Sequence, residues 1–417
     1  MQNNLIKIIK DLYQFDRSIF SEGYNQALEY INKKLPLKIL EVESGINLGT
    51  YIVREQWIIK DAWVKYKDRK IINCKNNPLH LAFNSISFKG KLDKKDFIKY
   101  LFTDSEMPDG IPQVSVNDTW GFCLTKNQYD KLKDGKYEVF INTDFQQGNI
   151  KIGEHFIKGE IEKEIVFFAN LDGRQANDNL SGVAMLIDFA KKLKCKHSLR
   201  FIFCPKEIGS LAWAINNNLR DIDFAVSVNA IGNDNCLMMQ RSFAKSTLVD
   251  MAFHMALSNN AVKQNEQYRK AEFLGSLRGD EAVFNDPQIN IPTILLTRYP
   301  YNEYNTDKDT PEIIKEKRIL ETEDVIQEII DILENNWIPQ RTIKGQLDKQ
   351  RFGANSLEPE LARRIDYLWY RVDGRMSVLE LALAHELDFY EVDKLMMKLK
   401  EADFIKEKED DINLLPL

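Results

Sequence analysis

The chain begins with two stretches in which apolar residues recur at helical spacing, residues 4–15 and 22–35. A period of three to four residues predicts an amphipathic helix in each. The pattern changes near residue 50, where short alternating runs rich in aromatic residues begin, and it continues to about residue 145. Period-two alternation broken by Gly, Asp and Asn turns predicts a β-rich unit.

Beyond residue 160, near-continuous apolar strands alternate with amphipathic helices. The predicted strands are 162–170, 199–204, 223–228 and 292–297, and the predicted helices are 180–194, 208–219 and 325–333. Strands that are apolar throughout are typical of a parallel sheet covered by helices on both faces. The sequence therefore predicts the α/β fold class, with a mostly parallel sheet flanked by helices.

Polar residues occur where these predicted strands end. Asn170 and Asp172 follow the first strand, Lys206 and Glu207 the second, Asn229 the third and Asn305 the fourth. Ligands bind at the carboxyl ends of the strands in sheets of this kind. We therefore expect a functional site at this edge.

The same patterns divide the chain into three units. We predict an α/β domain built from residues 1–50 and 145–340, with a β-rich domain inserted at residues 51–144. After a polar connector at 340–356, three short helical patterns and room for one strand predict a winged-helix or helix-turn-helix module, and we assign residues 341–417 to it.

Composition narrows the function classes. No apolar run approaches the ~18 residues of a membrane span, and the charged stretch MQNNLIKIIKDLYQF lacks a small-residue cleavage site, so we expect no signal peptide. Five cysteines without a C-x-x-C pair favour reduced thiols over a disulfide framework or a zinc ribbon, and we expect a cytoplasmic protein. The net charge of −6 gives no global attraction to nucleic acid or to an anionic membrane.

Several longer stretches, in this order and spacing, carry a resemblance to a known family: RSIFSEGYNQALEYI, WGFCLTKNQYDKLKDGKYEV, ANDNLSG, PKEIGSLAW and GDEAVFNDPQINIPTILLTRYPYNEYNTDKDT. The chain resembles, over almost its whole length, a bacterial aminopeptidase-like family with an inserted β domain and a C-terminal winged helix. Members are often linked to polysaccharide biosynthesis loci. They are similar to the broader zinc aminopeptidase and glutaminyl cyclase fold.

The resemblance implies a set of metal-site positions. The site of a zinc aminopeptidase contains a strand-end histidine, a bridging aspartate and a pair of glutamates, one of which is the general base. A further acidic ligand and a histidine late in the chain complete it. On this sequence, these positions fall on Asn170, Asp178, Lys206 with Glu207, Asn229 and Asn305, with retained acidic positions at Asp172 and Asp280. The late position lies in the context YNEYNTDKDT, where Tyr-His-Thr is expected.

Three asparagines and a lysine thus stand where two imidazoles, a carboxylate and the base are expected. Asparagine offers zinc only a weak neutral carbonyl. An ammonium at Lys206 repels a divalent cation and, once protonated, cannot accept a proton. We therefore expect a catalytically degenerate protein, a pseudoenzyme with a binding or scaffolding role and no cofactor, possible ligands being a glycan or a peptide.

Two alternatives remain open. The first is an active metal-dependent aminopeptidase or amidohydrolase, and its all-oxygen ligand set of Asp172, Asp178, Glu207 and Asp280 suits Mg²⁺, Mn²⁺ or Ca²⁺ better than zinc. The second is a winged-helix DNA-binding regulator. From residue 357 to 417 there are nine Arg or Lys against fifteen Asp or Glu. Phosphate contacts dominate nucleic-acid affinity, so this charge favours docking onto the main domain or a partner protein.

A positive role for Lys206 follows from the same mapping. Four converging carboxylates are costly without a compensating cation, and we hypothesise that the Lys206 ammonium substitutes for the metal.

Simpler interpretations stand beside these. Lys206 could point into solvent, Asp178-Asn179 could cap a helix, Glu207 could be a first-turn helix acid, and His254 could be a packed helix residue.

Overall fold

The computed structural model describes residues 4–264, 267–349 and 359–408 of the 417-residue chain. Its core is an eight-stranded sheet. The order across the sheet is β1 (Lys38–Glu43), β10 (Asn149–Ile157), β12 (Ser198–Cys204), β11 (Glu164–Asn170), β13 (Ile222–Asn229), β16 (Thr293–Thr297), β14 (Met238–Gln240) and β15 (Arg269–Ala271). Strands β12, β11, β13 and β16 are parallel, whereas β10 and β14 pair with them in the antiparallel sense. The predicted α/β class is confirmed.

Strand β11 shows why helices cover both faces of the sheet. Phe167 belongs to one apolar core, whereas its neighbours Val166 and Phe168 belong to a second core on the opposite face. Successive side chains of a strand point to opposite faces, so an apolar strand needs cover on both. One face is covered by α1 (Leu5–Tyr13), α2 (Glu22–Asn32), α5 (Gly182–Lys192), α7 (Leu248–Gln264) and α9 (Glu316–Glu334), and the other by α6 (Ile208–Ile215) and α8 (Glu281–Phe284).

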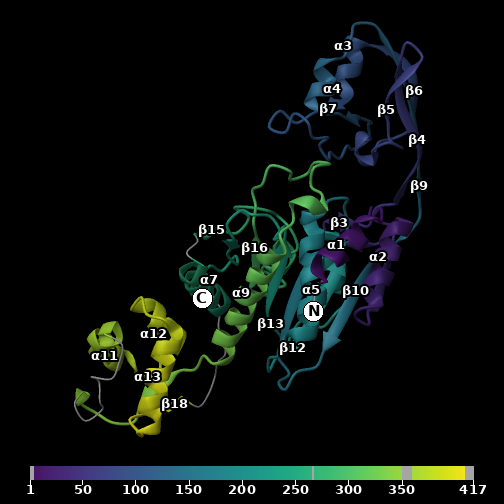
Figure 1. Ribbon diagram of the computed structural model, residues 1–417. Coiled ribbons are helices and arrows are strands. Elements are labelled where there is room, and N and C mark those ends of the chain that lie inside the picture. Colours follow the sequence, from purple (N-terminus) through teal and green to yellow (C-terminus); the bar gives the residue numbers. More distant parts are fainter. Residues whose placement is uncertain (1–3, 265–266, 350–358, 409–417) are drawn as a thin grey trace.

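A separate antiparallel sheet lies within the stretch predicted to be β-rich, at one end of the molecule (Figure 1). Its order is β5 (Arg69–Asn73), β4 (Gln56–Tyr66), β9 (Lys136–Gln146) and β6 (Phe88–Asp93), and the short elements beside it are α3 (Lys94–Phe97), β7 (Leu101–Phe102), β8 (Phe122–Cys123) and α4 (Lys126–Asp130). The short pair of β2 (Asn47–Leu48) and β3 (Tyr51–Ile52) instead packs on the main domain, where Leu48 belongs to the second core. Trp120 is buried in its core, stacked on Tyr100 and Phe88. We call residues 51–144 the inserted unit.

The opposite end of the molecule holds three helices, α11 (Pro359–Arg371), α12 (Val378–Ala384) and α13 (Phe389–Glu401), with a ribbon of β17 (Pro339–Arg341) and β18 (Ile405–Glu407) (Figure 1). This unit packs on α7, where the Asn259 amide donates to Asp388 at 3.0 Å. Asp388 also caps α13, and Asp393 accepts a hydrogen bond from Trp337 at 2.9 Å. Asp388, which caps α13, and Asp393, within this helix, therefore both take part in packing contacts. In the described residues, no helix is both long and apolar enough to cross a membrane.

The structure departs from the predicted elements in two ways. Helix α6 ends at Ile215 rather than Leu219, because the amides of Asn216 and Asn217 fold back onto the carbonyls of Ala212 and Trp213. Asparagine side chains compete in this way for backbone groups. The sheet also gains the outer strands β1 and β10 on one side and β14 and β15 on the other. These strands are short or only half buried and therefore lack a continuous apolar pattern.

Arg17, which is 1% exposed, fixes the loop that follows β11. Its guanidinium donates to the carbonyls of Leu171 at 3.2 Å and Gln175 at 2.8 Å, and also to those of Leu12 and Phe15. Burial lowers its pKa to about 10, so the group stays charged at neutral pH. One buried side chain therefore links the N-terminal helices to the loop of residues 171–175.

We predict that Arg17→Met lowers the free energy of unfolding by about 3 kcal/mol or more, because four carbonyls, most of them buried, each lose a hydrogen bond from the guanidinium. Guanidinium denaturation followed by circular dichroism measures the change. Arg220→Met, at an exposed arginine, is the matched control and should leave the midpoint unchanged. An Arg17→Met protein that unfolds at the wild-type midpoint would show that this linkage is dispensable.

Candidate functional site

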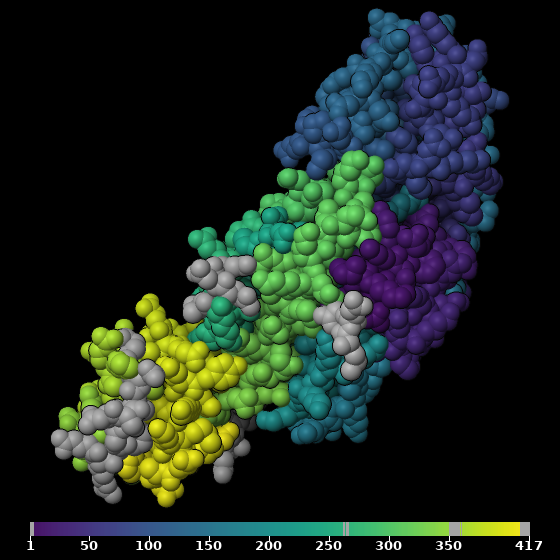
Figure 2. Space-filling model, viewed as in Figure 1, coloured from purple at the N-terminus to yellow at the C-terminus, as the bar shows by residue number. Residues whose placement is uncertain are grey.

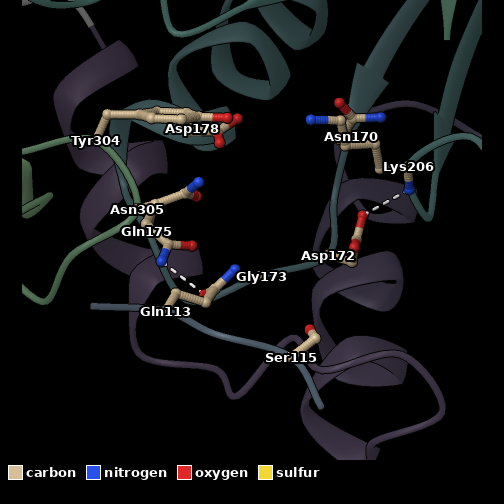
Figure 3. Close-up of a pocket in the computed structure, with 10 residues that line it drawn as sticks. All are labelled: Gln113, Ser115, Asn170, Asp172, Gly173, Gln175, Asp178, Lys206, Tyr304 and Asn305. Carbon is tan, nitrogen blue, oxygen red and sulfur yellow. Dashed lines mark hydrogen bonds between the residues drawn. The ribbon is translucent and has the colours of Figure 1, made fainter. Parts of the chain in front are cut away.

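The carboxyl ends of three adjacent parallel strands bring the predicted site residues together. Asn170 ends β11, opposite Cys204 at the end of β12, and Asn229 ends β13. A pocket of about 280 Å³ opens at this edge (Figure 3). It is lined by Gln113, Ser115, Asn170, Asp172, Gly173, Gln175, Asp178, Lys206, Tyr304 and Asn305. Five residues singled out from the sequence therefore line one cavity.

Three other predicted residues do not line the pocket. Asp280 is fully buried behind Asn170, whose amide nitrogen donates to Asp280 Oδ2 at 2.5 Å. Asn229, also buried, donates to Asn170 Oδ1 at 3.4 Å. The Asn170 amide is thus held from both sides, with its nitrogen turned to a carboxylate.

Asp280 is an internal acceptor. It also accepts hydrogen bonds from the Glu207 backbone N–H at 3.0 Å and from Ser210 Oγ at 2.6 Å. Burial raises its pKa, and these donors together with Lys206 oppose the rise. The retained acidic position therefore anchors the start of α6 and the end of β11 to each other.

Glu207 is turned away from the pocket. Its carboxylate accepts a hydrogen bond from Tyr51 at 3.0 Å and lies 3.5 Å from Arg278 Nε. It stands before α6 with a φ of 58° and makes no side-chain cap. These contacts join Tyr51, the first residue of β3, and Arg278 to the residue that precedes α6.

Lys206 lies in the pocket and is only partly exposed, so the interpretation that places it in solvent does not hold. Its backbone N–H donates to Asp172 Oδ1 at 2.8 Å (Figure 3). Burial alone would lower the pKa of the ammonium, but the nearby carboxylates, Asp178 first, raise it above the usual value. Among the described residues, Nζ forms no ion pair within 4.0 Å and no hydrogen bond. Its attraction to the carboxylates therefore acts at longer range.

The carboxylates that face Lys206 are desolvated. Burial raises the pKa of Asp172 to about 6, opposed by the backbone N–H and the ammonium of Lys206. Burial also raises the pKa of Asp178, opposed by Lys206 and by a hydrogen bond from Asn229. A buried carboxyl is expensive to ionise. The ammonium is the largest favourable influence on the Asp178 carboxylate, and it adds to the backbone N–H in favouring the Asp172 carboxylate.

The capping interpretation of Asp178-Asn179 applies to the second residue alone. Asn179 Oδ1 accepts from the backbone N–H of Gly182, the first residue of α5, at 3.2 Å, and from that of Ala230 at 3.1 Å. The Asp178 side chain enters the pocket instead, on the same side as Tyr304 and across from Asn170 and Lys206 (Figure 3).

Two buried acids near the site were not anticipated from the sequence. Asp309 accepts hydrogen bonds from the backbone of Asn177 and Asp178 and from the Tyr301 hydroxyl, and burial raises its pKa to about 7. Glu281 accepts from Gln240 and from the Gly279 backbone, and burial raises its pKa to about 7. Their sequence signal lies in NTDKDT and GDEAVF, the motifs in which Asn305 and Asp280 are predicted site residues.

The inserted unit contributes part of the pocket wall, which nothing in the sequence indicated. Gln113 and Ser115 come from this unit, and Gln113 Oε1 accepts from Gln175 Nε2 at 2.6 Å. The Gln113 backbone N–H donates to the carbonyl of Asn305 at 2.7 Å. Figure 2 shows the inserted unit resting on the segment that contains Asn305. Both units therefore build the cavity.

The donors around the pocket do not fit a zinc ion. Zinc requires about three imidazole, thiolate or carboxylate ligands, yet all five histidines of the chain lie in described positions and none lines the pocket. Within the described ranges, no group of three or more His, Cys, Asp or Glu side chains could hold a metal ion. His254 instead lies on α7, beside Tyr268 at 3.2 Å and Lys270 at 3.1 Å. Amides and an ammonium occupy the site.

Solved structures with this fold define a class. A zinc aminopeptidase from Bacillus subtilis matches 78% of this chain and 93% of its own, at 13% identity and a TM-score of 0.58. An aminopeptidase from Aneurinibacillus sp. strain AM-1 matches 78% of this chain and 92% of its own, at 15% identity and a TM-score of 0.54. The chain therefore has the aminopeptidase-like fold.

The chain belongs to the DUF4910 family, a domain of unknown function, whose model matches residues 6–336. A crystal structure of a Clostridium acetobutylicum protein, described as a candidate peptidase, is 28% identical and covers 97% of this chain and 96% of that one, with a TM-score of 0.79. A protein of that organism, named for polysaccharide biosynthesis and an aminopeptidase-like domain, is 29% identical over 426 residues and 96% of each chain. The resemblance stated from the sequence is confirmed.

We predict that Lys206→Met destabilises the protein at pH 8 much more than at pH 5. The folded-state pKa of Asp172, about 6, lies above its usual 3.8. The folded protein therefore binds more protons than the unfolded chain between these values, and stability falls as pH rises through that window. Without the ammonium, the carboxylate pKa values rise further and the loss at pH 8 grows, on the order of 1–3 kcal/mol.

Thermal unfolding at pH 5 and pH 8 measures this difference. Lys308→Met, at an exposed lysine, is the matched control and should behave alike at both values. A Lys206→Met protein whose melting temperature matches the wild type at both pH values would show that the ammonium does not balance the acidic cluster.

Proposed function

We propose that this protein is a catalytically degenerate member of the aminopeptidase-like fold that binds a ligand in the pocket without hydrolysing it. The observation that carries the proposal is the position of Lys206. Its side chain lines the pocket at the place where the resemblance puts the general base, and the carboxylates around it raise its pKa. A group that stays protonated at neutral pH cannot accept a proton from water.

The metal positions support the same proposal. Asn170 and Asn305 line the pocket where the resemblance puts the two histidines, and Asn170 is engaged with Asp280 and Asn229. An amide carbonyl is a weak zinc ligand, and the ammonium of Lys206 repels a divalent cation electrostatically. We accordingly propose that the site works without zinc or another cofactor.

We place this binding role in polysaccharide or glycoconjugate biosynthesis. The support is the name of the Clostridium acetobutylicum relative, which matches 96% of this chain. The acidic C-terminal unit, packed on α7, fits contact with protein rather than with nucleic acid. We propose that it docks onto the main domain and is open to a protein partner.

The test is turnover. We predict that the wild-type protein cleaves neither aminoacyl-4-nitroanilides nor N-acetylated amino sugars, with or without added zinc or manganese, because it lacks both a base and a ligand set. Chromogenic assay and mass spectrometry of the products measure this. A preparation inactivated by heat supplies the background rate.

Hydrolysis above that background would contradict the proposal. If that hydrolysis were abolished by a chelator and by Asp178→Ala, the alternative of an active hydrolase with oxygen ligands would replace it. Hydrolysis that persists with the chelator and in Asp178→Ala would point to a contaminating enzyme. Equal hydrolysis by a Lys206→Met preparation would confirm that contaminant.

A further inference from the structure

The walls of the pocket are polar throughout. The ten lining residues comprise four amides, one hydroxyl, one phenol, two carboxylates, one ammonium and one glycine, with no aliphatic side chain among them. Amides and hydroxyls each donate and accept hydrogen bonds. Such a lining complements a ligand that carries several groups able to do both, as sugar hydroxyls do, and it does not complement an apolar side chain.

Some of these groups are available to a ligand. In the described chain, neither Lys206 Nζ nor Ser115 Oγ makes a hydrogen bond to another protein group. The Gln113–Gln175 pair at 2.6 Å presents a second set of amide edges beside them. The pocket therefore holds donors from both units: Lys206, which is partly buried, from the α/β core, and Ser115, which is exposed, from the inserted unit.

Tyr304 supplies an aromatic surface. Its ring is held edge-on by Tyr299 at 5.0 Å and Tyr301 at 5.7 Å, and it faces the cavity beside Asp178 (Figure 3). Aromatic rings combine an apolar surface with a polar tip. A sugar ring has a matching character, with C–H groups on its faces and hydroxyls around its edge.

The volume of the pocket and the charges of its lining further restrict the class of ligand. The volume of about 280 Å³ lies just below the ~300–1,000 Å³ of pockets for drug-sized ligands, which suits one ring. The lining carries one ammonium against the two carboxylates of Asp172 and Asp178, with Asp280 buried behind them. An added acid group would meet a net negative wall and be disfavoured.

We propose that the pocket binds a single sugar residue that carries no acid group, held between the α/β core and the inserted unit. This inference rests on the proposed function, because it names the ligand of the same site. The hydroxyls engage the amides of Asn305, Gln113 and Gln175, and the sugar face packs on Tyr304. Ser115 lies at the wall that the inserted unit provides.

The test is ligand-observed NMR by saturation transfer with the full chain. The probes are glucose, galactose, N-acetylglucosamine, glucosamine and glucuronic acid, each at millimolar concentration. We expect a signal from at least one of the first four and none from glucuronic acid. Ser115→Trp, at an exposed position, fills the cavity and should abolish the signal, whereas Ser246→Trp, exposed and outside the lining, should retain it. Asn305→Ala should weaken binding about tenfold.

Three outcomes overturn the inference, and a fourth overturns the proposed function instead. Binding of glucuronic acid alone contradicts the charge argument, and binding that survives Ser115→Trp places the sugar elsewhere. If none of the probes gives a signal, the sugar ligand is rejected. If the protein also cleaves none of the hydrolase substrates, its proposed non-catalytic role still stands. Conversely, a sugar that binds and is chemically altered by the enzyme supports this inference and rejects the proposed function.

Discussion

The central interaction that we propose for the pocket is the long-range attraction between one ammonium and the buried carboxylates near it. Lys206 lies beside Asp172 and across the cavity from Asp178 (Figure 3), and burial raises the pKa of both acids. Carboxylates that converge in a poorly solvated site need a positive charge near them. In a metal site a divalent ion supplies that charge. In our proposal, the Lys206 ammonium, in the loop after β12, supplies it in this chain.

The surrounding contacts are compatible with this proposal. The Asn170 amide donates to Asp280, and Asp280 in turn holds the start of α6. The Glu207 carboxylate leaves the cavity for Tyr51 and Arg278. What remains is a polar cavity with amides on several sides, better matched to hydrogen bonding with a ligand than to activation of water.

Much of this could be read from the sequence because it depends on local pattern. Continuous apolar strands revealed the parallel centre of the sheet, and the polar residues at their ends revealed Asn170, Asp172 and Lys206, since parallel strands end at one edge. Contacts between distant segments could not be read in this way. Gln113 reaches the pocket only through the packing of the inserted unit on residues near Asn305, and the orientation of Glu207 depends on Tyr51, far away in the chain.

The most direct test of the central claim is elemental analysis of protein purified without chelator and without a histidine tag, counting metal atoms per chain. If Lys206 occupies the role of the metal, the content stays well below one atom per chain, even after incubation with zinc and manganese followed by desalting. A stoichiometric metal that is lost in Asp178→Ala would contradict the account, because the carboxylates would then be neutralised by an ion and not by the lysine.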